Sequence, residues 1–125
     1  MTRLILRSTI FSLACATFIG TAAFADAPEV LAVETQKSGM GWRFDVTIKH
    51  NDTGWDHYAD AWEVLDQDGN RLGLRKLAHP HVEEQPFTRS LSSVMVPDGT
   101  RVVYVRASCS KGGWKSNTVA VELKH

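Results

Sequence analysis

The sequence predicts an all-β fold, a seven-stranded antiparallel β-sandwich, which follows a removable N-terminal segment. The clearest strand is residues 42–49, where Trp42, Phe44, Val46 and Ile48 alternate with polar residues. Because successive side chains of a strand point to opposite faces, this alternation buries one face and leaves the other in water. Similar short apolar segments recur between turn residues, which is typical of all-β sandwiches and barrels.

The other six strands are expected at residues 30–34, 58–65, 71–77, 87–96, 101–109 and 115–123. Turns are expected where Gly, Pro, Asn and Asp gather, at residues 37–41, 66–70, 97–100 and 111–113. No internal repeat or linker interrupts this pattern, so residues 26–125 are predicted to form a single domain.

Residues 1–25 are predicted to be a cleavable signal helix. Two arginines precede an apolar run at residues 10–20, and Ala23-Phe24-Ala25 has the small-x-small pattern of a cleavage site. A membrane anchor is disfavoured because the run is shorter than the roughly 20 apolar residues that a spanning helix needs. We therefore expect cleavage after Ala25 and a periplasmic or secreted location.

Lipid attachment at Cys15 is a less favoured alternative. Ser12 stands where a lipobox has leucine, and the apolar run continues beyond Cys15. Cleavage after Ala25 leaves Cys109 as the sole cysteine, so the domain is expected to lack an intramolecular disulfide, which is unusual for a small exported protein.

The charge balance disfavours nucleic acid and membrane surfaces as partners. The chain has 14 Lys and Arg against 14 Asp and Glu, and the signal segment removes two arginines, which leaves a slightly acidic domain. The sequence contains no phosphate loop, dinucleotide fingerprint or nucleophile elbow, so we do not expect an enzyme.

Seven strands with a tryptophan, Trp62, in the third resemble an immunoglobulin or fibronectin type III sandwich, although the cysteine pair of immunoglobulin domains is missing. The stretch from Gly54 to Leu91 also resembles the core of a family of small exported proteins of Gram-negative bacteria. That resemblance implies export and attaches no activity.

A histidine cluster is predicted from the register of the central hairpin. Opposing apolar residues pair Trp62 with Leu74 and Val64 with Leu72, and Gly69 takes the left-handed position of a three-residue loop. The same register, extended outward, places His57 opposite His79, with His81 on the same side.

His57, His79 and His81 are therefore the predicted ligands of a divalent transition metal, Zn(II) or Cu(II). Asp56 and Glu83 are close in sequence and could add a carboxylate. Two alternatives stay open: ordinary loop histidines that hydrogen-bond their surroundings, and a pH-sensitive contact.

Two weaker candidates have simpler interpretations. Asp52, Asp56 and Asp60 form an oxygen-rich stretch that could bind calcium, but the EF-hand spacing is absent. Cys109 follows the apolar face of its strand, so it is expected in the core rather than as a nucleophile.

The favoured function is an exported, non-enzymatic binding domain for a metal. The alternative is a module that docks a protein of the cell envelope through a strand edge or through the loops at residues 52–58 and 80–87. Trp55, Tyr58 and Phe87 are the residues expected to contact such a partner.

Overall fold

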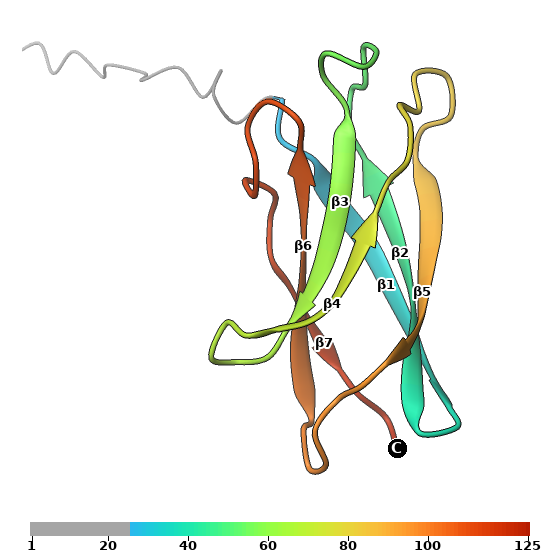
Figure 1. Cartoon of the computed structure of the whole chain (residues 1–125), viewed down its shortest axis with the longest axis vertical. Helices are drawn as coiled ribbons and strands as arrows, with labels where there is room; N and C mark the ends of the chain where they lie inside the picture. Colours follow the sequence, from blue (N-terminus) through green and yellow to red (C-terminus); the bar gives the residue numbers. More distant parts are fainter. Residues whose placement is uncertain (1–25) are drawn as a thin grey trace, which may run out of the picture.

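The computed structural model describes residues 26–125, which form seven strands in two antiparallel sheets (Figure 1). The strands are β1 (Glu29–Ser38), β2 (Gly41–Lys49), β3 (Ala59–Leu65), β4 (Arg71–Lys76), β5 (Phe87–Val94), β6 (Val102–Cys109) and β7 (Val119–Glu122). The predicted fold class and all seven strands are confirmed, with β1 longer and β7 shorter than expected. The predicted signal helix lies outside the described residues.

One sheet has the strand order β1-β2-β5 and the other β4-β3-β6-β7. Constant-type immunoglobulin domains place the fourth strand beside the fifth, whereas β4 pairs here with β3. The sandwich is therefore immunoglobulin-like in its layers, with its fourth strand in the sheet of the third. Within residues 26–125 no helix is long and apolar enough to cross a membrane.

The two sheets enclose one apolar core. The inward face of β2 is the predicted one, since Trp42, Phe44, Val46 and Ile48 are all at most 2% exposed. Trp62 of β3 is fully buried between the sheets, as the sequence indicated. Both sheets and the core between them are formed by residues 26–125.

The predicted register of the β3–β4 hairpin is wrong by one residue. The loop itself is as expected: the Asp66 N–H donates to Asn70 O at 2.9 Å, and Gly69 has a φ of 84°. A β-bulge then shifts the pairing, so that Trp62 faces Arg75 and Glu63 faces Leu74. A bulge inserts one unpaired residue, and this changes the face to which the following side chains point.

The shift separates two leucines that were expected to share a face. Leu72 packs against the core, whereas Leu74 lies on the side of Glu63, whose buried carboxylate is paired with Arg71 and Arg106. The outer face of β3 is thus held by an ion-pair cluster rather than by apolar side chains.

This register predicts unequal costs for two matched substitutions. Leu72→Ala is expected to lower the free energy of unfolding by about 2 kcal/mol, because it opens a gap beside the core. Leu74→Ala is expected to cost less than about 1 kcal/mol, because that side chain is not in the core. Urea unfolding of residues 26–125 measures both; equal losses would support the pairing predicted from the sequence.

Candidate metal centre

The inward-facing positions of β2 and β6 lead to two metal-binding residues at the same end of the sandwich. In β2 the buried alternation runs on to His50, which is 3% exposed, and in β6 it runs on to Cys109, which is 4% exposed. Both strands end at the same end of the sandwich, at the top of Figure 1, where the loops at residues 50–58 and 110–118 lie. We call this the site end; the described chain also starts there, at Asp26.

The loop between β2 and β3 adds a second histidine. It folds back on itself, with the His57 N–H donating to Gly54 O at 3.1 Å and the Thr53 N–H donating to His57 O at 3.0 Å. His57 is 8% exposed, and its ring meets that of His50 edge-on at 4.8 Å between centroids. Two residues later, Ala59 pairs with Cys109, which sets His57 beside the end of β6.

His50, His57 and Cys109 form a group in which one donor atom of each residue lies within 4.8 Å of the others. An ion at the centre of such a triangle would be at most about 2.8 Å from each atom. Zinc bonds to nitrogen and sulfur are about 2.0 to 2.3 Å, so each donor would move inward by at most about 0.5 to 0.8 Å. The His57 Nε2 atom is buried and has no hydrogen-bond partner among the described residues.

A buried carboxylate fixes the orientation of His50. Nδ1 of His50 donates to Oδ1 of Asp52 at 2.5 Å, and Oδ1 also accepts the Ala59 N–H at 3.0 Å. Oδ2 of Asp52 accepts the His81 N–H at 2.7 Å, so both oxygens act as acceptors. A carboxylate on one ring nitrogen is the usual support of a metal-binding histidine. The ligand atom would then be Nε2 of His50, which in this structure contacts the Asp26 carbonyl oxygen at 2.6 Å.

The thiol of Cys109 sits in a tight turn. The backbones of Cys109 and Gly113 exchange two hydrogen bonds, and the Gly112 N–H donates to the Cys109 Sγ at 3.1 Å. A Cβ at position 112 would lie 3.3 Å from the sulfur, so glycine permits this close approach. His57 and Cys109 share a cavity of about 170 Å³, which gives a metal ion room beside them.

The predicted ligand set is only partly brought together. His57 belongs to the group just described, but neither His79 nor His81 does. Those two rings lie 4.5 Å apart on the segment before β5, where the Nε2 atom of His81 accepts the Arg89 guanidinium at 2.8 Å. The register extension that set His57 opposite His79 is therefore wrong, because the bulge in the hairpin shifts the pairing and β4 ends at Lys76.

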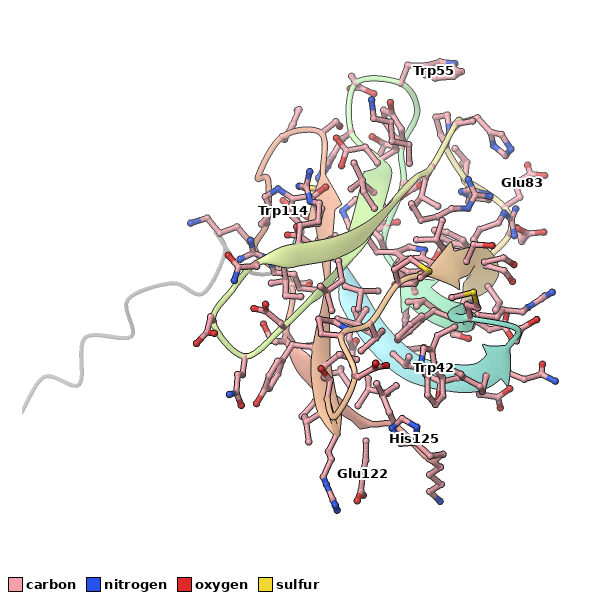
Figure 2. All side chains as sticks on the ribbon, turned by 60° about the horizontal axis from the view of Figure 1, so that its bottom comes forward. Trp42, Trp55, Glu83, Trp114, Glu122 and His125 are labelled. Atoms are coloured by element: carbon pink, nitrogen blue, oxygen red, sulfur yellow. The ribbon has the colours of Figure 1, made fainter. Side chains whose placement is uncertain are left out.

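The remaining predicted residues fall into exposed and buried groups. Asp56 and Glu83 are exposed, and Figure 2 shows Glu83 at the periphery of the molecule. Trp55 is 69% exposed at the tip of its loop (Figure 2). Its ring is edge-on to that of Tyr58. Phe87 is 3% exposed and stacked under His81, with ring centroids 3.9 Å apart, so it faces the interior.

Sequence reasoning missed His50, considered Asp52 only as a calcium ligand, and treated Cys109 only as a core residue. The signal was present: His50 is the next inward position after Ile48, and Cys109 is the next after Ala107. Two inward alternations that each end on a metal-binding residue indicate a site when their strands end at the same side of a sandwich.

Comparison with known proteins gives one informative similarity. The chain is similar to a protein of Halomicrobium mukohataei named "Putative lipoprotein", with 41% identity over 86 residues. The aligned part is 69% of this chain and 42% of that protein, so the chain spans less than half the length of its relative. No family model matches the chain, and no solved structure matches it significantly.

Burial lowers the pKa of His81 below its ordinary value of 6.5. The positive charge of Arg89 and the neighbouring His79 lower it further, while Glu84 and Asp52 act in the opposite direction. The Arg89 guanidinium donates to Nε2, so this nitrogen has no free lone pair for a proton. The folded protein therefore holds His81 neutral.

This environment predicts a pH-dependent loss of stability. Below about pH 6.5 the unfolded chain takes up a proton on His81 that the folded chain excludes. The unfolded state therefore binds more protons, and this stabilises it relative to the folded state. The free energy of unfolding is expected to fall as the pH drops from 6.5 through the lowered pKa of His81. Urea titrations across this range should show a smaller fall in His81→Gln, while His125→Gln, a change at a histidine that does not contact His81, behaves like the natural sequence. A parallel fall in all three proteins would contradict the assignment.

The contacts of Asp52 predict a large cost for losing its charge. In Asp52→Asn the amide cannot accept at both positions, so one of the buried N–H donors loses its partner. We expect a loss of about 3 kcal/mol in the free energy of unfolding. Asp56→Asn, an exposed control on the same loop, should stay within about 0.5 kcal/mol of the natural sequence. Equal stability of the two variants would overturn the role given to Asp52.

Proposed function

We propose that this chain is an exported, non-enzymatic binding domain that holds a divalent transition-metal ion through His50, His57 and Cys109. The observation that carries this proposal is the Nε2 atom of His57, which is buried without a hydrogen-bond partner beside two other donor atoms. A buried polar atom without a partner costs about 1 to 3 kcal/mol, and a metal bond would remove that cost.

The donor set favours zinc or copper. Two imidazoles and one thiolate are borderline to soft ligands, which suit these ions and disfavour calcium and magnesium. The calcium candidate Asp52 serves instead as the support of His50, with both of its oxygens already accepting hydrogen bonds. Three protein ligands leave one position of a tetrahedral zinc ion to be filled.

Binding is proposed over catalysis because the sequence offers no set of residues to which catalytic roles can be assigned. The cavity shared by His57 and Cys109 is about 170 Å³, which has room for an ion and a few waters.

Export is supported from two directions. The N-terminal segment has the pattern of a signal peptide, and the relative from Halomicrobium mukohataei is named a lipoprotein, a class of protein that acts outside the cytoplasm. We infer a periplasmic or secreted location, where the supply of metal ions varies with the surroundings.

Metal titration tests this proposal. Residues 26–125, stripped with chelator, are titrated with Co(II) while the thiolate-to-metal absorption band is followed, and Zn(II) affinity is measured by competition with a chromophoric chelator. We expect Cys109→Ser to abolish the band, and His57→Gln to weaken Zn(II) binding by at least about tenfold. Asp52→Asn should weaken binding about 10- to 100-fold through His50.

His79→Ala is the matched control, because it removes a histidine outside the group and should leave the affinity unchanged. Circular dichroism of each metal-free variant confirms that the fold is retained. The proposal fails if Zn(II) binds no more tightly than about 1 mM, or if His79→Ala and His81→Ala weaken binding while Cys109→Ser does not.

A docking role is the second candidate, favoured by the 69% exposure of Trp55 at the tip of a loop. Exposed tryptophans are common anchors of protein interfaces. This role does not require a metal, so Trp55→Ala would weaken contact with an envelope partner and leave metal affinity unchanged.

A further inference from the structure

Asp26 lies directly against the candidate metal centre. Its carbonyl oxygen is 2.6 Å from the Nε2 atom of His50, the nitrogen that a metal would use. Asp26 and Ala27 also line the cavity of about 170 Å³ together with His57 and Cys109. The start of the described chain thus contacts His50 directly and lines a cavity together with His57 and Cys109.

The position of Asp26 in the sequence gives this contact a chemical consequence. Cleavage after Ala25 is expected to convert the Asp26 nitrogen from an amide into a primary amine. An amide nitrogen has no available lone pair, whereas an amine nitrogen is a good ligand for zinc and copper. Covalent geometry keeps this nitrogen within about 3.7 Å of the Asp26 carbonyl oxygen, and so within roughly 6 Å of the His50 ring nitrogen.

We propose that removal of the leader completes the metal centre, with the α-amine of Asp26 as the fourth ligand beside His50, His57 and Cys109. This inference rests on the proposed function, since it concerns the same site. It explains how a centre with three side-chain donors reaches the four ligands that zinc prefers. It also means that the chain binds metal tightly only after export and processing.

The protons released when the ion binds can be counted from the donor groups. His50 gives up its hydrogen bond to the Asp26 carbonyl and loses the Nε2 proton, and the thiol of Cys109 loses its proton. The α-amine, which is largely protonated at neutral pH, loses one as well. All three protons pass to solvent, so a chain with a free Asp26 amine releases one more proton per ion than a chain with an amide at that position.

Two lysines also line the cavity, but their positive charges need not lie beside a bound ion. Lys111 and Lys115 are exposed, so their ammonium groups can extend into water while the stems cover the site. The side-chain carboxylate of Asp26 is a second possible donor from the same residue, and the experiment separates it from the amine.

The test compares two chains that differ by one residue. One begins at Asp26, released from a fusion by a protease that leaves no extra residue; the other keeps Ala25 in front of it. Zn(II) affinity is measured by competition, and proton release by calorimetry in buffers of different ionisation enthalpy. We expect the chain with Ala25 to bind Zn(II) at least about tenfold more weakly and to release about one proton fewer.

Asp26→Asn in the chain that begins at position 26 is the matched control, and it should bind Zn(II) within about twofold of the natural sequence. Equal urea midpoints of the metal-free chains show that Ala25 leaves the sandwich intact.

Three outcomes would overturn the inference in different ways. Equal affinity and equal proton release, with the Co(II)–thiolate band intact, would remove the amine ligand and leave the proposed function standing. Absence of binding in both chains would remove both proposals. A mass spectrum of the exported protein that starts anywhere other than Asp26, for example at a lipidated Cys15, would also overturn it, because the Asp26 nitrogen would then be an amide.

Discussion

The loop after β2, the start of β3 and the segment before β5 meet at the site end of the sandwich, and one buried carboxylate joins them. Asp52 accepts hydrogen bonds from His50 after β2, from Ala59 at the start of β3, and from His81 in the segment before β5. A carboxylate with 3% exposure is stable there only because each of its oxygens is paired with donors. The positions of both histidine pairs, His50 with His57 and His79 with His81, depend on this anchor.

The arrangement divides the histidines by chemistry. His81 stacks on Phe87, and its Nε2 atom already accepts the Arg89 guanidinium, so it contributes to folding and to pH sensitivity rather than to metal binding. His57 has a buried nitrogen without a partner beside a thiol and a second imidazole. The lone pair of His81 is thus already used, whereas His57 has a ring nitrogen without a partner. His50 would become a ligand only by giving up the contact of its Nε2 atom with the Asp26 carbonyl oxygen.

The absence of a disulfide among residues 26–125 fits this picture. Cys109 is free and buried, and the core between the sheets contains two fully or nearly buried tryptophans, Trp42 and Trp62. A domain of this size with a continuous core can fold without a covalent link between its sheets. The cysteine is thereby available as a donor at the end of β6, where a disulfide would have consumed it.

The strands were predictable because period-two alternation is a local property: it needs only the order of residues such as Trp42, Phe44, Val46 and Ile48. The three-residue loop with Gly69 was predictable for the same reason, since the left-handed position of a turn is fixed by a few neighbouring residues. The register beyond that loop was not, because the bulge at Leu72 depends on how the hairpin packs against the opposite sheet.

The sequence by itself determined the all-β class, the seven strands and the inward position of Cys109. Only the tertiary structure decided that His57 belongs with His50 and Cys109 rather than with His79 and His81, and that Asp52 orients the ring of His50. The physical reason is that a metal centre is a set of distances between donor atoms from separate strands. Those distances follow from strand order and from the loops at one end of the sandwich. They cannot be predicted from the alternation of residues within a single strand.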